Sequence, residues 1–395
     1  MSSRSISPVR LLVLQGTPFC NIDCRYCYLA DRSSTARMSP ATAEAIVVNL
    51  LASRLVRGDL LINWHAGEPL VLGPAWYEDM VPRLRGLEAA GAVRHSLQTN
   101  GMLITPRFCD VFEKLAISIG VSIDGPAFLH DRHRRTRHDR PTHAATMRGV
   151  RHLQERRIPF NVICVVTEES LDHADELYDF FLGHDMTAVA LNIDELEGSH
   201  ARSSMTAAGY SDRFARFMDR LYTRCQRDGM IALREFFEME DAISNPRPRK
   251  NSHTLPFVNL TIGWNGDFST FSPELLGHRH PRYGDFIFGN VHEGRVCDAV
   301  EQPGFRRVYD DILLGVEQCE RSCDYFDVCM GGCPSNKVFE NGTFDCSETL
   351  HCRNKVWSVA ELVMGRLEAG QRHLAAPAAE TGGSGPPPAE RAAGR

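Results

Sequence analysis

The chain has 395 residues, 43% of them hydrophobic, which is enough for a large core and for two domains. Its formal net charge is −6, so no overall basic character attracts nucleic acid. No apolar run approaches the ~20 residues of a membrane span, and no secretory signal precedes the first apolar segment, which predicts a cytoplasmic protein.

The first 200 residues alternate between predicted strands and helices. Strands are predicted over 9–14, 60–64, 93–99, 117–123, 160–167 and 188–193. Helices are predicted over 41–54, 75–87, 106–115, 144–156 and 171–182. This alternation implies a parallel sheet with right-handed crossovers, and six strands are too few for a closed eight-stranded barrel. We therefore predict an α/β fold with a partial (β/α)6 barrel over 8–200.

The remaining chain divides by composition. Residues 201–250 are predicted to form a helical bridge and linker, with helices over 211–240 and a proline-rich boundary loop over 245–251. A cysteine-rich domain is predicted over 251–372, opening with a β-hairpin over 257–271. Residues 373–395 are rich in Ala, Gly and Pro without apolar periodicity, which predicts a disordered tail.

Three cysteines share one loop directly after the first predicted strand. Cys20, Cys24 and Cys27 are separated by three and then two residues. In a reducing compartment, thiols this close indicate metal binding, and thiolates suit iron–sulfur clusters or zinc. A structural zinc site needs four ligands, so three favour a [4Fe-4S] cluster with one iron open to a small molecule. A zinc site completed by a distant histidine is the alternative.

Other polar turns follow the next predicted strands. Gly67 and Glu68 follow the second strand, Asn100 the third and Asp124 the fourth. The carboxyl ends of parallel strands meet at one rim, where sites in such folds gather. We therefore expect these turns to converge on the cysteine loop.

Cys20-x3-Cys24-x2-Cys27-Tyr28 resembles the signature of the radical S-adenosylmethionine (SAM) superfamily, in which SAM chelates the open iron. His65-Ala66-Gly67-Glu68-Pro69 resembles the family's Gly-Gly-Glu-Pro turn, with Ala66 in place of the first glycine. The segments from Gln98 to Gly101, from Ser122 to Pro126 and from His130 to Arg134 resemble further parts of the SAM site. The resemblance implies SAM contacts from Gly67, Glu68, Pro69, Asn100, Ser122, Asp124 and Arg134. Taken alone, the basic run 130–143 is typical of a solvated face.

A second group of six cysteines lies near the C-terminus. It resembles the SPASM extension of radical SAM peptide maturases, which carries auxiliary [4Fe-4S] clusters, although Cys319 stands one residue further out than usual. The hairpin residues 265–273 lack the cysteines and the proton-accepting Asp found in sulfatase-maturing relatives. The resemblance implies at least one auxiliary cluster, on Cys319, Cys323, Cys329 and Cys352. Cys333 and Cys346 would hold a second, incomplete cluster or substitute in the first. A zinc ribbon is the alternative.

Four blocks, 64–70, 95–101, 124–131 and 339–344, resemble the cyclophane-forming maturases of the GrrM type. That subgroup joins an aromatic ring to the β-carbon of a nearby residue in a ribosomally made precursor peptide. The resemblance also implies an external electron donor of the flavodoxin or ferredoxin type. Because few residues precede the first strand, the leader peptide would be held by the C-terminal domain, an oligomer or a separate leader-binding protein.

Several other functions stay open on the sequence. A sulfatase maturase making formylglycine, or a thioether-forming maturase, fits the same cysteine pattern. An RNA-modifying enzyme would use the basic run 130–143, against which the net charge of −6 argues. A non-catalytic peptide-binding module would leave the three-cysteine loop without a role.

Overall fold

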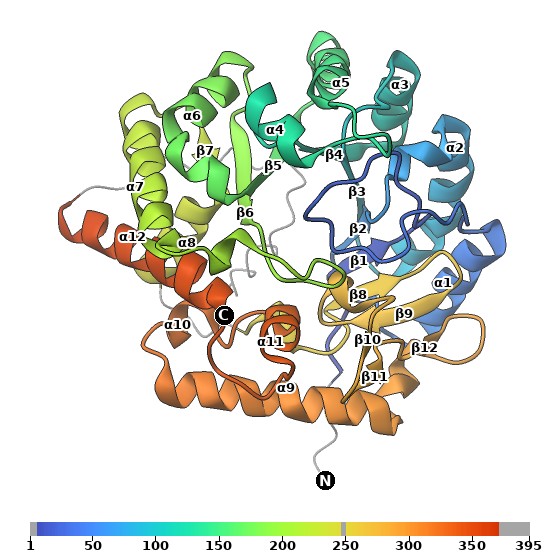
Figure 1. Ribbon diagram of the computed structural model, residues 1–395. Helices are drawn as coiled ribbons and strands as arrows, with labels where there is room; N and C mark the ends of the chain where they lie inside the picture. The colour runs from blue at the N-terminus through green and yellow to red at the C-terminus, as the bar shows by residue number, and fades with distance from the viewer. Residues whose placement is uncertain (1–5, 246–249, 371–395) are drawn as a thin grey trace, which may run out of the picture.

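The computed structural model describes residues 6–245 and 250–370 and contains a ten-stranded sheet within them. Its six central strands are parallel and neighbour one another in chain order, curving into an open barrel (Figure 1). They are β1 (Leu11–Leu14), β2 (Leu60–Trp64), β3 (Val93–Thr99), β4 (Ile117–Ser122), β5 (Phe160–Val166) and β6 (Ala188–Ile193). The predicted partial barrel is therefore confirmed.

The predicted helices cover the outside of the barrel (Figure 1). Ser39 begins the first one by accepting a hydrogen bond from the amide of Thr42 at 3.1 Å, with Pro40 at the first helical position. The second helix ends four residues earlier than predicted and continues as a 3₁₀ turn, since Pro82 and Gly86 disfavour further α-helix. The covering helices are α1 (Pro40–Ala52), α2 (Pro74–Arg83), α3 (Pro106–Leu115), α5 (His143–Glu155) and α6 (Ala174–Gly183).

One α-helix within the first 200 residues was not predicted. Helix α4 (Ala127–His133) overlaps the start of the basic run, in which the residues His130 and Arg134 are 0% and 6% exposed. The interpretation of this run as a wholly solvated face was therefore wrong at these two positions. Both side chains have hydrogen-bond partners inside the protein, which permits their burial.

The C-terminal segment adds to the barrel's own sheet. Strand β8 (Asn259–Ile262) pairs in parallel with β1 and forms the predicted hairpin with β9 (Asp267–Thr270). Strand β12 (Gly289–Asn290) extends this edge, and β7 (Ala232–Leu233) extends the opposite edge beside β6. Strands β10 (Arg279–His280) and β11 (Gly284–Asp285) form a separate pair.

Further helices complete the C-terminal half. The predicted bridge is two helices, α7 (Tyr210–Asp228) and α8 (Arg234–Ser244), and the last helix, α12 (Ser358–Glu368), packs against both. Between them in sequence lie α9 (Pro303–Ser322), α10 (Phe326–Cys329) and α11 (Pro334–Asn341). The division into barrel, bridge and cysteine-rich domain stays a prediction. The predicted tail 373–395 and residues 246–249 of the boundary loop lie outside the described residues.

The two faces of the barrel sheet differ in chemistry. On the helix-facing side, Trp64 packs edge-on against Trp76 and Tyr77 of α2. Side chains alternate along a strand, so the neighbouring Asn63 faces the other way, and there it accepts a hydrogen bond from Ser96 at 3.2 Å. Gln98 donates similarly to Ser122 at 2.9 Å. This inner face is therefore polar and suited to binding a polar molecule.

Candidate active site

The three-cysteine loop leaves the end of β1 and is held by its own backbone and by arginines. The amide of Cys20 donates to the carbonyl of Arg32 at 3.1 Å, and Arg137 Nε donates to the carbonyl of Cys20 at 2.9 Å. Arg32 donates to the carbonyl of Cys24 at 3.2 Å. These bonds use carbonyl oxygens and leave the thiols to bind other groups.

The turn after β2 presses against the start of this loop. Ala66 and Gly67 are both left-handed, with φ of 75° and 63°. A Cβ atom on Gly67 would stand 2.6 Å from the carbonyl oxygens of Thr17 and Phe19, so only glycine fits. The amide of Glu68 donates to the carbonyl of Phe19 at 2.8 Å, which fixes the turn beside the cysteines.

Glu68 ties three strand ends together. One carboxylate oxygen accepts from the amide of Leu70 at 2.9 Å and from the hydroxyl of Thr99 at 2.7 Å. The other accepts from the amide of Asn100 at 2.8 Å. Burial raises the pKa of Glu68, and these donors oppose that rise. In this structure Glu68 positions the turn and Asn100, and its predicted contact with SAM stays a prediction.

Asn100 joins the third strand end to the loop. Its Nδ2 donates to Asn21 Oδ1 at 2.8 Å, and its carbonyl accepts from Thr146 at 2.9 Å. Asn21 directly follows Cys20, so the predicted convergence on the cysteine loop is present at this strand. The neighbouring Pro69 is buried and begins a short 3₁₀ turn, while Ser122 lies on the polar inner face.

Asp124 and Arg134 form a buried ion pair beside Cys24. Arg134 donates through Nε at 2.9 Å and through Nη2 at 3.1 Å, one bond to each oxygen of Asp124. Tyr26 and the amide of Val165 also donate to this carboxylate. Burial alone would raise the pKa of Asp124, but the guanidinium holds it below its usual value. Arg134 Nη1 lies 4.0 Å from Cys24 Sγ, which places a positive charge next to a predicted cluster ligand.

His130 supports this pair from behind. Its Nδ1 accepts from the amide of Asp124 at 3.3 Å, and its Nε2 lies 3.1 Å from the hydroxyl of Thr142. That hydroxyl donates to the carbonyl of Arg134 at 2.6 Å, so Nε2 carries the hydrogen and the ring is neutral. Burial lowers the pKa of His130 to about 3, consistent with a neutral ring.

The loop fits a [4Fe-4S] cluster by its donor chemistry. Burial raises the pKa values of Cys20 and Cys27, and that of Cys24 to about 12, so these thiols ionise only beside a strong positive charge such as bound iron. In the described part of the chain, no three His, Cys, Asp or Glu side chains converge enough to hold a single metal ion. A cluster takes one thiolate on each iron and does not require such convergence.

Four cysteines of the second group lie close together. The charges of Cys323 and Cys319 act on Cys329. Burial raises the pKa of Cys352 to about 11, and the charges of Cys329 and Cys319 add to this rise. Lys337 donates to the sulfur of Cys319 at 3.3 Å and lowers the net charge there. This grouping agrees with the auxiliary ligand set that the resemblance implies, which stays a proposal.

Of the other two cysteines, Cys346 also lies near Cys319, whose charge acts on it, and Cys333 has a different environment. Cys346 accepts from Asn341 at 3.3 Å. The sulfur of Cys333 lies 3.1 Å from the hydroxyl of Ser335 and 3.8 Å from His253 Nδ1. The imidazolium lowers the pKa of Cys333 despite burial, and the thiolate raises that of His253 to about 9. Cys333 thus lies beside a histidine in this structure.

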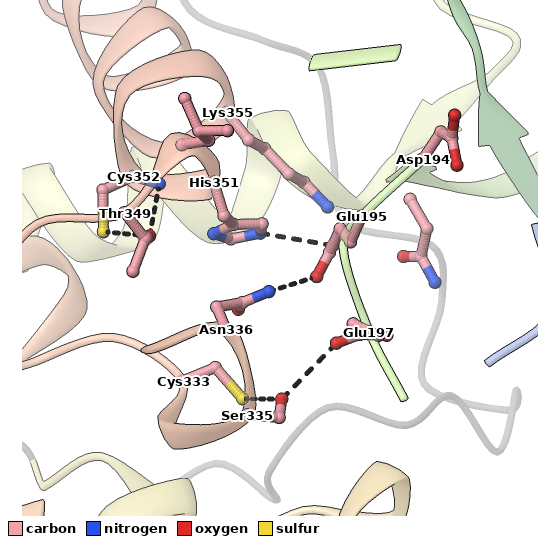
Figure 2. A network of polar contacts seen from close by, with 12 residues as sticks. Asp194, Glu195, Glu197, Cys333, Ser335, Asn336, Thr349, His351, Cys352 and Lys355 are labelled. Carbon is pink, nitrogen blue, oxygen red and sulfur yellow. Dashed lines mark hydrogen bonds and ion pairs between the residues drawn. The ribbon is translucent and has the colours of Figure 1, made fainter. Parts of the chain in front are cut away.

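A loop after β6 joins the two cysteine groups, and Figure 2 shows its contacts. Ser335 donates to Glu197 at 3.4 Å, and Asn336 donates to Glu195 at 2.5 Å. On the other side, the hydroxyl of Ser199 donates to the carbonyl of Tyr28 at 3.0 Å, next to Cys27. The acidic residues of this loop therefore lie between the rim that carries the cysteine loop and the C-terminal cysteines.

These acidic residues were not predicted from the sequence. Burial, together with Glu195 and Glu274, raises the pKa of Glu197 well above its usual value. A carboxylate in this state readily accepts a proton. The rule that identified Asn100 and Asp124, that polar residues after strand ends line the site, identifies Glu195 and Glu197 as well when applied to β6.

Comparisons with known proteins agree with this geometry. A family model described as the radical SAM superfamily matches residues 14–181. A serine-type anaerobic sulfatase-maturating enzyme of Klebsiella aerogenes is 31% identical over 84% of this chain and 81% of its own. The chain belongs to the radical SAM superfamily. An uncharacterized protein of Synechocystis sp. is 40% identical to this radical SAM enzyme over 92% of the chain and 93% of its own.

Solved structures share the fold of this radical SAM enzyme. Native anSMEcpe with bound AdoMet and Cp18Cys peptide has a TM-score of 0.76 at 19% identity and covers 92% of this chain and 98% of its own. Streptococcus suis SuiB bound to S-adenosylmethionine has a TM-score of 0.62 at 15% identity, covering 88% and 78%. At these identities the likeness concerns the fold.

Membership of the superfamily decides the class of chemistry. The protein is a radical SAM enzyme, and its cofactors are S-adenosyl-L-methionine and a [4Fe-4S] cluster, as the resemblance of the cysteine loop implied.

Among the described residues, none of the helices combines the length and apolarity needed to cross a membrane.

Proposed function

We propose that this radical SAM enzyme modifies a ribosomally made precursor peptide by joining an aromatic ring to the β-carbon of a nearby residue. The observation that carries the proposal is the acidic loop 194–200, placed between the cysteine loop and the C-terminal cysteines. A substrate held there would meet the radical source on one side and an electron acceptor on the other. The likeness of four sequence blocks to cyclophane-forming maturases supports the crosslink in particular.

The chemistry removes two hydrogens from the peptide for each new carbon–carbon bond. When bound, the cluster and SAM supply a 5′-deoxyadenosyl radical that takes one hydrogen atom from the substrate. The remaining hydrogen leaves as a proton and one electron, and the auxiliary cluster is the proposed electron acceptor. The chain must therefore provide a base near the substrate, and we assign this role to Glu197 because its loop lies between the cysteine loop and the C-terminal cysteines.

Formylglycine formation is the second candidate, and the Klebsiella relative favours it. In formylglycine formation the substrate also loses one hydrogen atom, one proton and one electron, as it does in crosslinking. The hairpin differs from the pattern expected of that group, because residues 265–273 contain no cysteine, and the hydroxyl of Ser272 lies 3.8 Å from the sulfur of Cys333 instead. This difference favours the crosslink.

Mass spectrometry of the product tests the two functions. The anaerobically reduced enzyme, with SAM and the precursor peptide, should yield 5′-deoxyadenosine and a peptide lighter by two hydrogens per crosslink. Fragmentation should show no cleavage between the two joined residues. A two-hydrogen loss confined to one Ser or Cys would support formylglycine formation, and an unchanged peptide mass despite SAM cleavage would contradict both.

Replacing Glu197 by glutamine is expected to separate the radical step from the proton step. Loss of one positioned base lowers rates by about 10²–10⁴-fold, so crosslinked product should fall by that factor. SAM cleavage should persist, because Glu197 is not a predicted ligand of the cluster or SAM. Glu340, which accepts amide hydrogen bonds from Leu350 and His351, is the control: Glu340→Gln should keep product formation. Equal product loss in both variants would show that Glu197 affects the product only through folding.

A further inference from the structure

The surface outside the cysteine loop has more arginine than the active site uses. Residues 19–37 and 130–143 contain eight arginines and no lysine, against four aspartates and no glutamate. Their net charge is +4, whereas the whole chain carries −6. Positive charge is therefore concentrated on two short segments, and only Arg134 among these arginines belongs to the buried ion pair.

The two segments run side by side. The amide of Asp23 donates to the carbonyl of Arg135 at 2.7 Å, and the amide of Arg25 donates to that of His133 at 3.0 Å. An antiparallel bridge between Ile22 and Thr136 continues the pairing, and Figure 1 shows the segments adjacent at the barrel mouth. The arginine-rich stretch thus covers the loop that carries Cys20, Cys24 and Cys27.

Several of these arginines reach solvent and have at most a long, exposed ion pair. The side chains of Arg25 and Arg132 are 62% and 59% exposed, and their nearest carboxylates lie at 4.0 and 3.7 Å. Arg137 and Arg140 are also exposed. Three of the four local aspartates have closer partners: Asp23 pairs with Arg32, Asp139 with Arg135, and Asp131 accepts two backbone amides. The surface therefore keeps a net positive charge.

The other sides of the cysteine loop are covered by protein. The turn at Gly67 packs against Phe19, and both Ser199 and His278 contact the carbonyl of Tyr28. The arginine-rich segment is thus the solvent-facing cover of the loop. Each SAM cleavage consumes one electron, which must come from a donor that approaches this loop, since electron transfer requires proximity.

We propose that Arg25, Arg132, Arg137 and Arg140 form the docking surface for a small acidic protein that carries one electron. The carrier docks by charge complementarity, gives one electron to the cluster on Cys20, Cys24 and Cys27, and leaves oxidised by one electron. No bond is made or broken in this step. The proposal rests on the superfamily assignment and on those three ligands, and it is independent of the bond that the enzyme forms in its substrate.

RNA is the other polyanion that such a surface could attract. Single-stranded nucleic acid is bound through aromatic stacking as well as charge. Here the guanidinium of Arg137 covers the ring of Phe19 at 5.1 Å, and Tyr26 lies against Arg134. The aromatic rings of the region are thus already occupied, which favours a protein partner.

The test uses the full-length enzyme with its clusters reconstituted and an acidic flavodoxin in its hydroquinone form. The variant is Arg132→Glu/Arg140→Glu, since neither side chain donates a hydrogen bond among the described residues and neither lies in the cysteine loop. The control is Arg151→Glu/Arg216→Glu, which changes net charge equally on two outer helices, α5 and α7. Stopped-flow absorbance follows cluster reduction, and calorimetry measures flavodoxin binding without turnover.

At low ionic strength, the docking variant should be reduced by flavodoxin about tenfold more slowly than the wild type, with weaker binding and a shallower salt dependence. Dithionite, which needs no docking surface, should reduce both clusters at unchanged rates. Equal slowing in the control variant, wild-type rates in the docking variant or slower reduction by dithionite would each overturn the proposal. RNA binding would also overturn the proposal. The result would be that the docking variant alone loses salt-dependent binding of an RNA oligonucleotide, while flavodoxin still reduces it at the wild-type rate. If the docking variant shows the expected slower reduction but the wild-type enzyme forms no crosslink in the peptide, only the proposed function is contradicted.

Discussion

Replacing Cys24 by alanine is expected to abolish SAM cleavage while the C-terminal cysteines keep their iron. Three thiolates are the minimum that leaves a single open iron, so removal of one makes the proposed SAM cluster incomplete. The C-terminal group is linked to a different part of the chain, through α9 and Lys337, and should fold unaffected. The same result is expected for Cys20→Ala and Cys27→Ala.

Iron, acid-labile sulfide and 5′-deoxyadenosine measured on anaerobically purified protein check this prediction. Cys109→Ala is the matched control, because that thiol is buried under the helices away from the barrel mouth. Residual 5′-deoxyadenosine formation in Cys24→Ala would contradict the assignment of the loop. Zinc without sulfide remaining in the variant would instead favour a zinc ribbon at the C-terminal group.

Replacing Asp124 by asparagine is expected to lower both stability and SAM binding. The substitution keeps the shape but leaves Arg134 buried beside a neutral amide, and breaking such a pair typically costs about 3–5 kcal/mol. Arg134 would also lose the partner that holds it near Cys24. Denaturant unfolding measures the first effect, and calorimetric titration of SAM into the cluster-loaded protein measures the second.

The double variant Asp124→Asn/Arg134→Met separates the two effects. It removes the unpaired charge and should recover part of the lost stability, but SAM affinity should stay low. Recovery of SAM binding together with stability would show that the ion pair acts only through folding. Stability unchanged in the single variant would contradict the burial of the pair.

The same pair predicts the direction of an acid effect. The pKa of Asp124 is lowered in the folded protein, so its contribution to stability is complete above the ordinary carboxyl value of about 3.9. That contribution is lost as the pH falls through the lower folded value. The wild type should therefore lose more stability on acidification below about pH 4 than Asp124→Asn does, which unfolding curves across pH would show.

Much of the barrel was predictable because its signals are local. The inner strands are short apolar runs ended by turns, and the predicted strands over 60–64, 93–99 and 188–193 match the structure at both ends. Helix α4 was missed because its seven residues include basic and histidine side chains without apolar periodicity. Its residues Leu129 and His130 are buried, and His130 contacts Thr142 and His143 at the start of α5. The hairpin over 257–271 was predictable, but its pairing with β1 was not.

Part of the candidate site was likewise predictable from the sequence, and part depended on tertiary contacts. The positions of Glu68, Asn100 and Asp124 after strand ends were enough to predict that they converge. Their hydrogen bonds show something more specific, since Glu68 holds the rim together and Asp124 holds Arg134. Glu197 carried no local motif, and only its contact with Ser335, 138 residues later, places it against the C-terminal cysteines.

The spacing of Cys20, Cys24 and Cys27 is a property of one short loop, so the residues alone were enough to indicate a cluster, and their resemblance to the superfamily signature implied SAM. Backbone geometry over eight residues leaves such ligands close together in any fold. Which charges surround the loop is different, because Arg134 is 110 residues from Cys24 and reaches it only through α4. The separation of Cys333 from the other C-terminal cysteines likewise depends on His253 and Ser272, which packing brings beside it. Burial decides these contacts, since groups from distant segments must pair when they leave water.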